Sequence, residues 1–151
     1  MITKIKSKGG TVEIHSETMH GKETVESVFK CTEPPHPDLN LIFVKLEKIA
    51  REILDIGKDT WHGQITVDSV SFSDSESTGV QGAVITGHVA LETSNSPFNF
   101  NTPHLPFAQY SPTGTSPLMP SDGIELLDKL SKEAALYQSG KKRAQLELIG
   151  K

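Results

Sequence analysis

Cysteine is nearly absent from this chain, since Cys31 is the only one among 151 residues. One cysteine excludes an intrachain disulfide and fits a reducing compartment, so we expect a cytoplasmic location. Long apolar runs are also missing, and the first ten residues lack the apolar core of a signal peptide. The sequence therefore predicts neither a secretory leader nor a membrane span.

Motifs of catalysis and of cofactor binding are missing as well. The chain contains no G-x-x-x-x-G-K-[ST] phosphate loop, no G-x-G-x-x-G dinucleotide motif and no G-x-S-x-G nucleophile motif. Its six histidines are scattered, without the H-x-x-x-H or C-x-x-C spacing of a zinc site. We therefore expect no catalytic residue, no cofactor and no metal. The sequence favours a non-enzymatic protein and leaves an enzyme open.

The charge of the chain is divided unevenly between its ends and its body. The net charge is −4, while residues 1–8 and 140–151 each carry +3, which leaves −10 for residues 9–139. An acidic body repels phosphate backbones, so the chain is not a general duplex-DNA binder through its whole surface. The candidate phosphate contacts lie in the two ends and are Lys4, Lys6, Lys8, Lys141, Lys142 and Arg143. Alternatively, the first three are solvated lysines that blunt the edge of a sheet.

The first part of the chain reads as three antiparallel strands. Apolar and polar residues alternate, in places imperfectly, over residues 2–8, 11–15 and 23–31, and the "KGG" stretch can turn the chain between the first two. Cys31 ends the third segment, where we expect a small buried residue. The prolines in "TEPPHPDLN" then stop strand pairing, because proline donates no backbone hydrogen bond.

A helix over residues 37–56 is the next predicted element. Apolar residues recur there at every third and fourth position, with His36 or Asp38 available as the cap. We expect this stripe to pack on the sheet. The residues expected in that contact are Ile42, Leu46, Ile49 and Ile53 on the helix and Ile85, Val89 and Leu91 on the sheet.

Two more strands are predicted, over residues 64–72 and 80–94. In the first, the pair Ile65 and Val67 is out of phase with the pair Val70 and Phe72. Such a phase change near Asp68 predicts a β-bulge or a twist in the strand. Both faces of the second strand are partly apolar, as expected of a central strand covered by a helix.

The stretch from residue 95 to residue 120 is rich in proline and aromatic residues. Residues 98–101 can add a short strand, and an ordered loop over the body is expected beyond it. Long loops often carry binding residues, and the candidate ligand residues here are Asn99, Asn101, Thr102 and His104. The alternative is that the prolines and aromatic rings seal an edge of the core.

A second helix is predicted over residues 121–138, with Ser121 or Asp122 as its cap, Glu125 completing a capping box and Gly140 ending it. The fold class is therefore α+β: an antiparallel sheet of five or six strands with two helices and a long proline- and aromatic-rich loop. Residues 1–139 form one domain and residues 140–151 a basic tail. A sheet face that no helix covers would be exposed to solvent or would form an interface, so a homodimer is one option.

The tail "GKKRAQLELIGK" contains Gln145, Leu146, Glu147, Leu148 and Ile149 in succession. This pentapeptide resembles the one by which bacterial replication and repair proteins dock on the DNA polymerase sliding clamp, commonly Gln-Leu-Ser/Asp-Leu-Phe. The resemblance implies that Gln145, Leu146, Leu148 and Ile149 bind the clamp. The chain departs from the common form at Glu147 and at Ile149, which implies weaker docking. The alternative is a last turn or strand packed against the body.

The whole chain, and "NSPFNFNTPHLP" and "GKKRAQLELIGK" especially, resembles a family of small uncharacterised proteins of tailed phages and prophages, encoded by early genes near replication and recombination functions. This resemblance supplies no catalytic residue. It implies the cytoplasm of an infected bacterial host and two functions. The first is a non-enzymatic accessory protein of DNA replication or recombination that docks on the host clamp. The second is an anti-defence protein that sequesters a nucleotide signal or inhibits a host immune protein, with single-stranded nucleic acid as a further candidate ligand.

Overall fold

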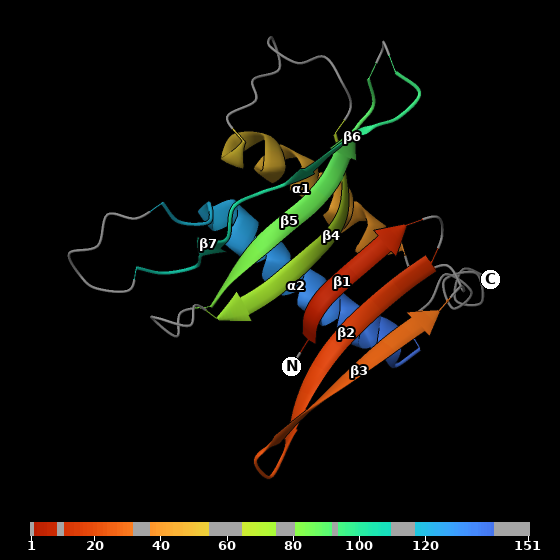
Figure 1. Ribbon diagram of the computed structural model, residues 1–151, viewed down its shortest axis with the longest axis vertical. Helices are drawn as coiled ribbons and strands as arrows, with labels where there is room; N and C mark the ends of the chain where they lie inside the picture. The colour runs from red at the N-terminus through yellow and green to blue at the C-terminus, as the bar shows by residue number, and fades with distance from the viewer. Residues whose placement is uncertain are drawn as a thin grey trace.

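The chain folds as an α+β protein with one antiparallel sheet and two helices (Figure 1). The computed structural model describes residues 2–8, 11–31, 37–54, 65–74, 81–91, 94–109 and 117–140. The elements in these residues are β1 (Ile2–Lys8), β2 (Thr11–His20), β3 (Glu23–Cys31), α1 (Pro37–Ile53), β4 (Ile65–Asp74), β5 (Gln81–Val89), β6 (Phe98–Asn101), β7 (Leu105–Pro106) and α2 (Ser121–Gln138). The predicted α+β class, with an antiparallel sheet and two helices, is confirmed, while residues 110–116 of the predicted long loop lie outside the described residues.

The sheet has the strand order β3-β2-β1-β4-β5-β6, and β7 pairs with β5 beyond the end of β6. Both helices lie on one face of this sheet, behind it in Figure 1, where α1 packs against β4 and α2, and α2 also contacts β1. No described helix covers the opposite face. Neither described helix is long and apolar enough to cross a membrane.

The predicted β-bulge is present in β4. The pairing of β4 with β5 shifts between Val67 and Ser69, so Asp68 is the extra residue. Because a bulge changes the phase of alternation, residues on either side of it can share one face. Ile65, Val67, Val70 and Phe72 are accordingly all buried in the core.

The core between the helices and the sheet follows the predicted helix stripe. Ile42, Leu46 and Ile49 on α1 are buried, as are Ile85 and Val89 on β5. Ile53, in the last turn of α1, is only partly buried against this cluster.

The prediction for Leu91 is wrong, because this residue is 37% exposed. β5 ends at Val89, so Leu91 lies past the last pair that β5 makes with its neighbours. Cys31 was expected to be buried and is half-buried, packed against the edge of the core.

The N-terminal cap of α2 differs from the prediction. Ser121 is the first residue of α2, and the N-cap is Pro120, which makes no side-chain hydrogen bond to the helix. Pro120 has φ −53° and ψ 142°, an extended conformation that leads the chain into the first turn. α1 begins at Pro37, with Asp38 in its first turn, and the other proposed cap, His36, lies outside the described residues. Proline suits this first helical position because its missing N–H has no partner there in any case.

Candidate functional site

The face of the sheet opposite the helices is covered by no described helix, and we call it the open face. Side chains alternate along a strand, so the neighbours of the buried core residues project onto it. Strand pairing places these residues there: Lys4, Lys6, Glu13, His15, Val28, Lys30, Ser69, Ser71, Val84, Thr86, His88, Asn99 and Asn101. The open face is thus mainly polar, with basic groups on β1 and β3.

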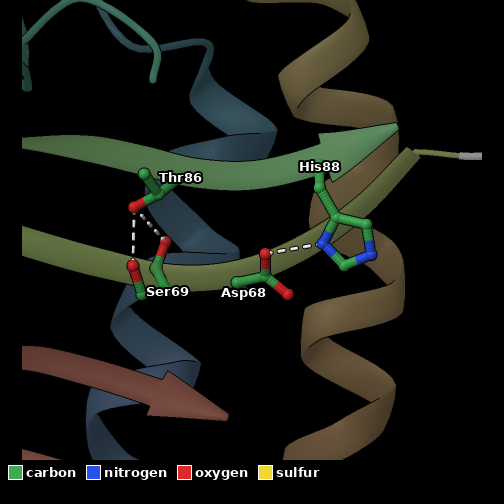
Figure 2. A network of polar contacts seen from close by, with 4 residues as sticks. All are labelled: Asp68, Ser69, Thr86 and His88. Carbon is green, nitrogen blue, oxygen red and sulfur yellow. Dashed lines mark hydrogen bonds and ion pairs between the residues drawn. The ribbon is translucent and has the colours of Figure 1, made fainter. Parts of the chain in front are cut away.

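Two polar pairs join β4 to β5 on the open face (Figure 2). The Nδ1 atom of His88 lies 2.7 Å from a carboxylate oxygen of Asp68. The hydroxyl oxygens of Ser69 and Thr86 are 2.6 Å apart, and Thr86 also donates to the backbone carbonyl of Ser69 at 3.4 Å. The bulge explains why the consecutive residues Asp68 and Ser69 both reach this side.

Serine, histidine and aspartate side chains therefore lie close together, but they do not form a nucleophilic triad. Such a triad needs the serine hydroxyl to donate to the histidine. Here the Ser69 hydroxyl pairs with the Thr86 hydroxyl at 2.6 Å, and His88 pairs with Asp68. The pairing of His88 Nδ1 with Asp68 orients the ring, and among the described residues Nε2 has no hydrogen-bond partner. The arrangement suits binding through polar groups.

Lys4 and Lys6 are half-buried on the open face, in a strand that is not an edge. β1 lies between β2 and β4, so the alternative that these lysines blunt a sheet edge is wrong for both. Lys6 lies between Glu13 on β2 and Ser69 on β4. The side chain of Lys8 is outside the described structure.

Glu13 is surrounded by groups that favour its charged form. His15 Nε2 donates to its carboxylate at 2.7 Å. This hydrogen bond is the main reason why the pKa of Glu13 lies below its ordinary value of 4.5; partial desolvation opposes it. The positive charges of Lys30 and Lys6 lower the pKa further. Lys6 and Lys30 thus place positive charge beside the Glu13 carboxylate on the open face.

Replacing this carboxylate should change how the protein responds to acid. A folded-state pKa below the unfolded value means that Glu13 stabilises the fold above about pH 4.5 and that this contribution disappears as the pH falls through the lowered pKa. Glu13→Gln should therefore unfold more easily than the native protein in urea at pH 7, with the difference shrinking by pH 3. Glu23→Gln, at the exposed start of β3, is the control. A difference that grows on acidification would contradict this reading.

Three of the four predicted ligand residues project onto the open face, at separate places. Asn99 pairs with His88 and Asn101 with Thr86. His104 lies over Gly82, where an added Cβ would meet the imidazole Cε1 at 2.5 Å, and its Nε2 donates to the Ser73 carbonyl at 3.2 Å. Residues 82 and 86 are about 13 Å apart along a strand. His104 therefore does not converge with the asparagines on one cavity.

Thr102, the fourth candidate, is a structural residue. Its side chain is buried, and its hydroxyl accepts a hydrogen bond from the Ile85 N–H at 2.9 Å. Its own N–H donates to the Ile85 carbonyl at 2.9 Å. Thr102 thus pairs with both the N–H and the carbonyl of Ile85, just past the end of β6. This placement gives no support to the ligand role predicted for Thr102.

Thr102→Val tests this assignment because valine keeps the shape and removes the acceptor. The Ile85 N–H would stay buried without a partner, which costs about 1–3 kcal/mol. We expect urea unfolding to show a loss of that size. Asn101→Ala, at the exposed neighbouring position, should leave stability within about 0.5 kcal/mol. Equal effects of the two changes would show that the hydroxyl has no structural role.

A pocket of about 720 Å³ lies away from the open face, at the N-terminal half of α2. Its apolar lining comprises Ile2, Phe72, Phe107, Ile124 and Leu127, and its polar lining Gln81, Ser121, Glu125, Asp128 and Ser131. The two carboxylates pair with lysines one turn along the same helix, at 3.6 Å and 2.9 Å. Sequence reasoning missed this pocket because β1, β4, β5, α2 and Phe107 form it jointly.

The proposed clamp-binding residues Gln145, Leu146, Leu148 and Ile149 lie outside the described residues, as do Lys141, Lys142 and Arg143. Within the described ranges, no group of three histidine, cysteine or acidic residues is placed to hold a metal ion. Comparison with protein-family models, with curated proteins and with solved structures finds no match to this chain.

Proposed function

We propose that the protein is a non-enzymatic accessory protein of phage DNA replication or recombination and that it docks on the host sliding clamp through Gln145–Ile149. The observation that carries the proposal is the Gln-Leu-Glu-Leu-Ile sequence near the end of the chain. A glutamine amide can satisfy a polar subsite of a groove, and aliphatic side chains can fill an apolar one. The acidic residue between the leucines can point to solvent.

The position of the peptide relative to the domain supports this proposal. The last described helix ends at Gln138, and Tyr137 is the last of the buried core residues. Gly140 follows with φ 113°, a conformation that suits glycine and ends a helix. The described core is thus complete before the peptide begins. The basic residues 141–143 would lie near DNA encircled by the clamp, where they could contact phosphates.

A synthetic peptide of residues 140–151 tests the docking chemistry directly. A peptide with two or three anchors should bind a preformed groove with a dissociation constant on the order of 1 μM, or about 8 kcal/mol. In titrations of purified bacterial sliding clamp, Gln145→Ala and the double change Leu148→Ala/Ile149→Ala should each remove most of the binding. Glu147→Asp, which restores the commoner residue, should keep or strengthen it. No saturable binding by the native peptide would end this proposal.

A second function, sequestration of a nucleotide signal in the manner of an anti-defence protein, is favoured by one observation. Lys4 and Lys6 lie on an inner strand of the open face, opposite Ser71 and Ser69 of β4, whose hydroxyl groups can bind a phosphate. Calorimetric titration with a panel of nucleotides tests it. Lys6→Gln should weaken binding, and Lys22→Gln, in the β2–β3 turn, should not. Heat signals that are identical for these variants would place any nucleotide elsewhere.

A further inference from the structure

The outer strand β3 presents a long, regular edge. It pairs with β2 along its whole length without a shift in register, and no described strand pairs with its other side. It contains no proline or glycine, and Val28 is 53% exposed and Val25 44% exposed. Proteins usually protect such an edge, because its unpaired backbone groups can bind another strand.

The opposite edge of the sheet is built differently. β6 has four residues and β7 has two, and Pro103 lies in the segment that separates them. Short strands and proline are the usual means by which an edge avoids pairing. Within the described structure, one edge is thus interrupted while the other is continuous, which points to β3 as the pairing edge.

We propose that β3 pairs with β3 of a second copy of this chain, antiparallel and centred on Val28. This register sets Val28 against Val28 of the second copy. It also sets Glu26 of each copy against Lys30 of the other, so that two pairs of opposite charges flank one apolar pair on the open face. Opposite charges directly across a strand pair are stabilising.

Neighbouring registers lack this match. A two-fold axis perpendicular to the sheet relates the two copies. Every alternative register must therefore still set side chains of the same face opposite each other. Centred on Glu26, the two Glu26 carboxylates would oppose each other. Centred on Ser27, Glu26 would face Val28 of the second copy, and centred on Phe29, Lys30 would face Val28. The charges of β3 therefore select a second copy and one register.

The resulting dimer joins two sheets into one and places both open faces on the same side. Seven residues of each strand, Val25–Cys31, would pair. An interface of this extent is smaller than the roughly 1,600 Å² of a typical stable complex, so association should depend on concentration in the micromolar range. The dimer would also carry two C-terminal tails, and its existence does not depend on what those tails bind.

Sedimentation of the full chain tests the proposal. We expect the mass to rise from 16.4 kDa toward twice that value as the concentration increases. Glu26→Lys should weaken the dimer about tenfold or more, because like charges would then face each other twice. Adding Lys30→Glu to that variant should restore it. Glu23→Lys is the matched control, since this register leaves residue 23 without a partner inside β3.

A cysteine placed on the two-fold axis gives a readout that does not depend on charge. In a Cys31→Ser background, Val28→Cys should form a disulfide-linked dimer under mild oxidation, whereas Thr24→Cys should not, because the two copies of residue 24 would be about 27 Å apart. Circular dichroism checks that each variant is folded. A chain that stays monomeric at about 100 μM would overturn the proposal. A dimer whose stability is unchanged by Glu26→Lys would also overturn it.

Discussion

Leu46→Ala should lower the free energy of unfolding by about 2–5 kcal/mol. Leu46 has no exposed surface and lies on the face of α1 that packs against β4 and α2. Removing its terminal atoms would take away buried apolar area and leave a cavity, since close-packed neighbours relax only in part. Urea unfolding followed by circular dichroism gives the free energy for the variant and the native chain.

Leu41→Ala is the matched control for this change. It alters the same residue type on the same helix, at a position that is 51% exposed. Alanine also favours a helix slightly more than leucine, so the expected loss stays under about 1 kcal/mol. If the two variants were destabilised equally, α1 would not pack on the sheet through the face that contains Leu46.

Gly87→Ala should destabilise the protein by about 3 kcal/mol. A Cβ at this position would overlap the Thr66 backbone oxygen and lie 2.7 Å from Cζ of Phe100. The ring could move, but the carbonyl belongs to β4, which is paired with β5 at this point. Relief of the overlap therefore requires β4 and β5 to separate locally.

Gly21→Ala separates this steric effect from the loss of glycine itself. Gly21, in the β2–β3 turn, has φ 65° and nothing within 4 Å of an added Cβ. Alanine there should cost about 1–2 kcal/mol for the left-handed backbone alone. Thermal unfolding of both variants gives the comparison. A smaller loss for Gly87→Ala than for Gly21→Ala would show that β4 and β6 do not approach Gly87 as closely as described.

The elements with strong local periodicity were predictable from the sequence. The stripe of α1 recurs every three to four residues, and the phase change near Asp68 indicated a bulge or a twist in β4, of which the bulge is present. Both signals lie within a short window of the chain. The cap of α2 was predicted wrongly, because Pro120 takes the N-cap position where the side chain of Ser121 or Asp122 was expected.

Features that depend on long-range pairing were not predictable in the same way. The contact between His88 and Asp68 spans 20 residues and needs both the β4–β5 register and the bulge. Thr102 looked like a loop ligand because nothing nearby in sequence indicates that it pairs with Ile85, 17 residues earlier. The alternation of Lys4 and Lys6 predicted a common face, while their place on an inner strand depends on the order of the strands.

The most direct test of the proposed function compares the full chain with a chain that ends at Gly140, each titrated against purified sliding clamp. Both proteins should unfold with the same midpoint, since the described core is complete by Tyr137. We expect saturable micromolar binding by the full chain and none by the shortened one. Equal binding by both proteins, or no binding by the full chain at clamp concentrations of about 100 μM, would contradict docking through Gln145–Ile149.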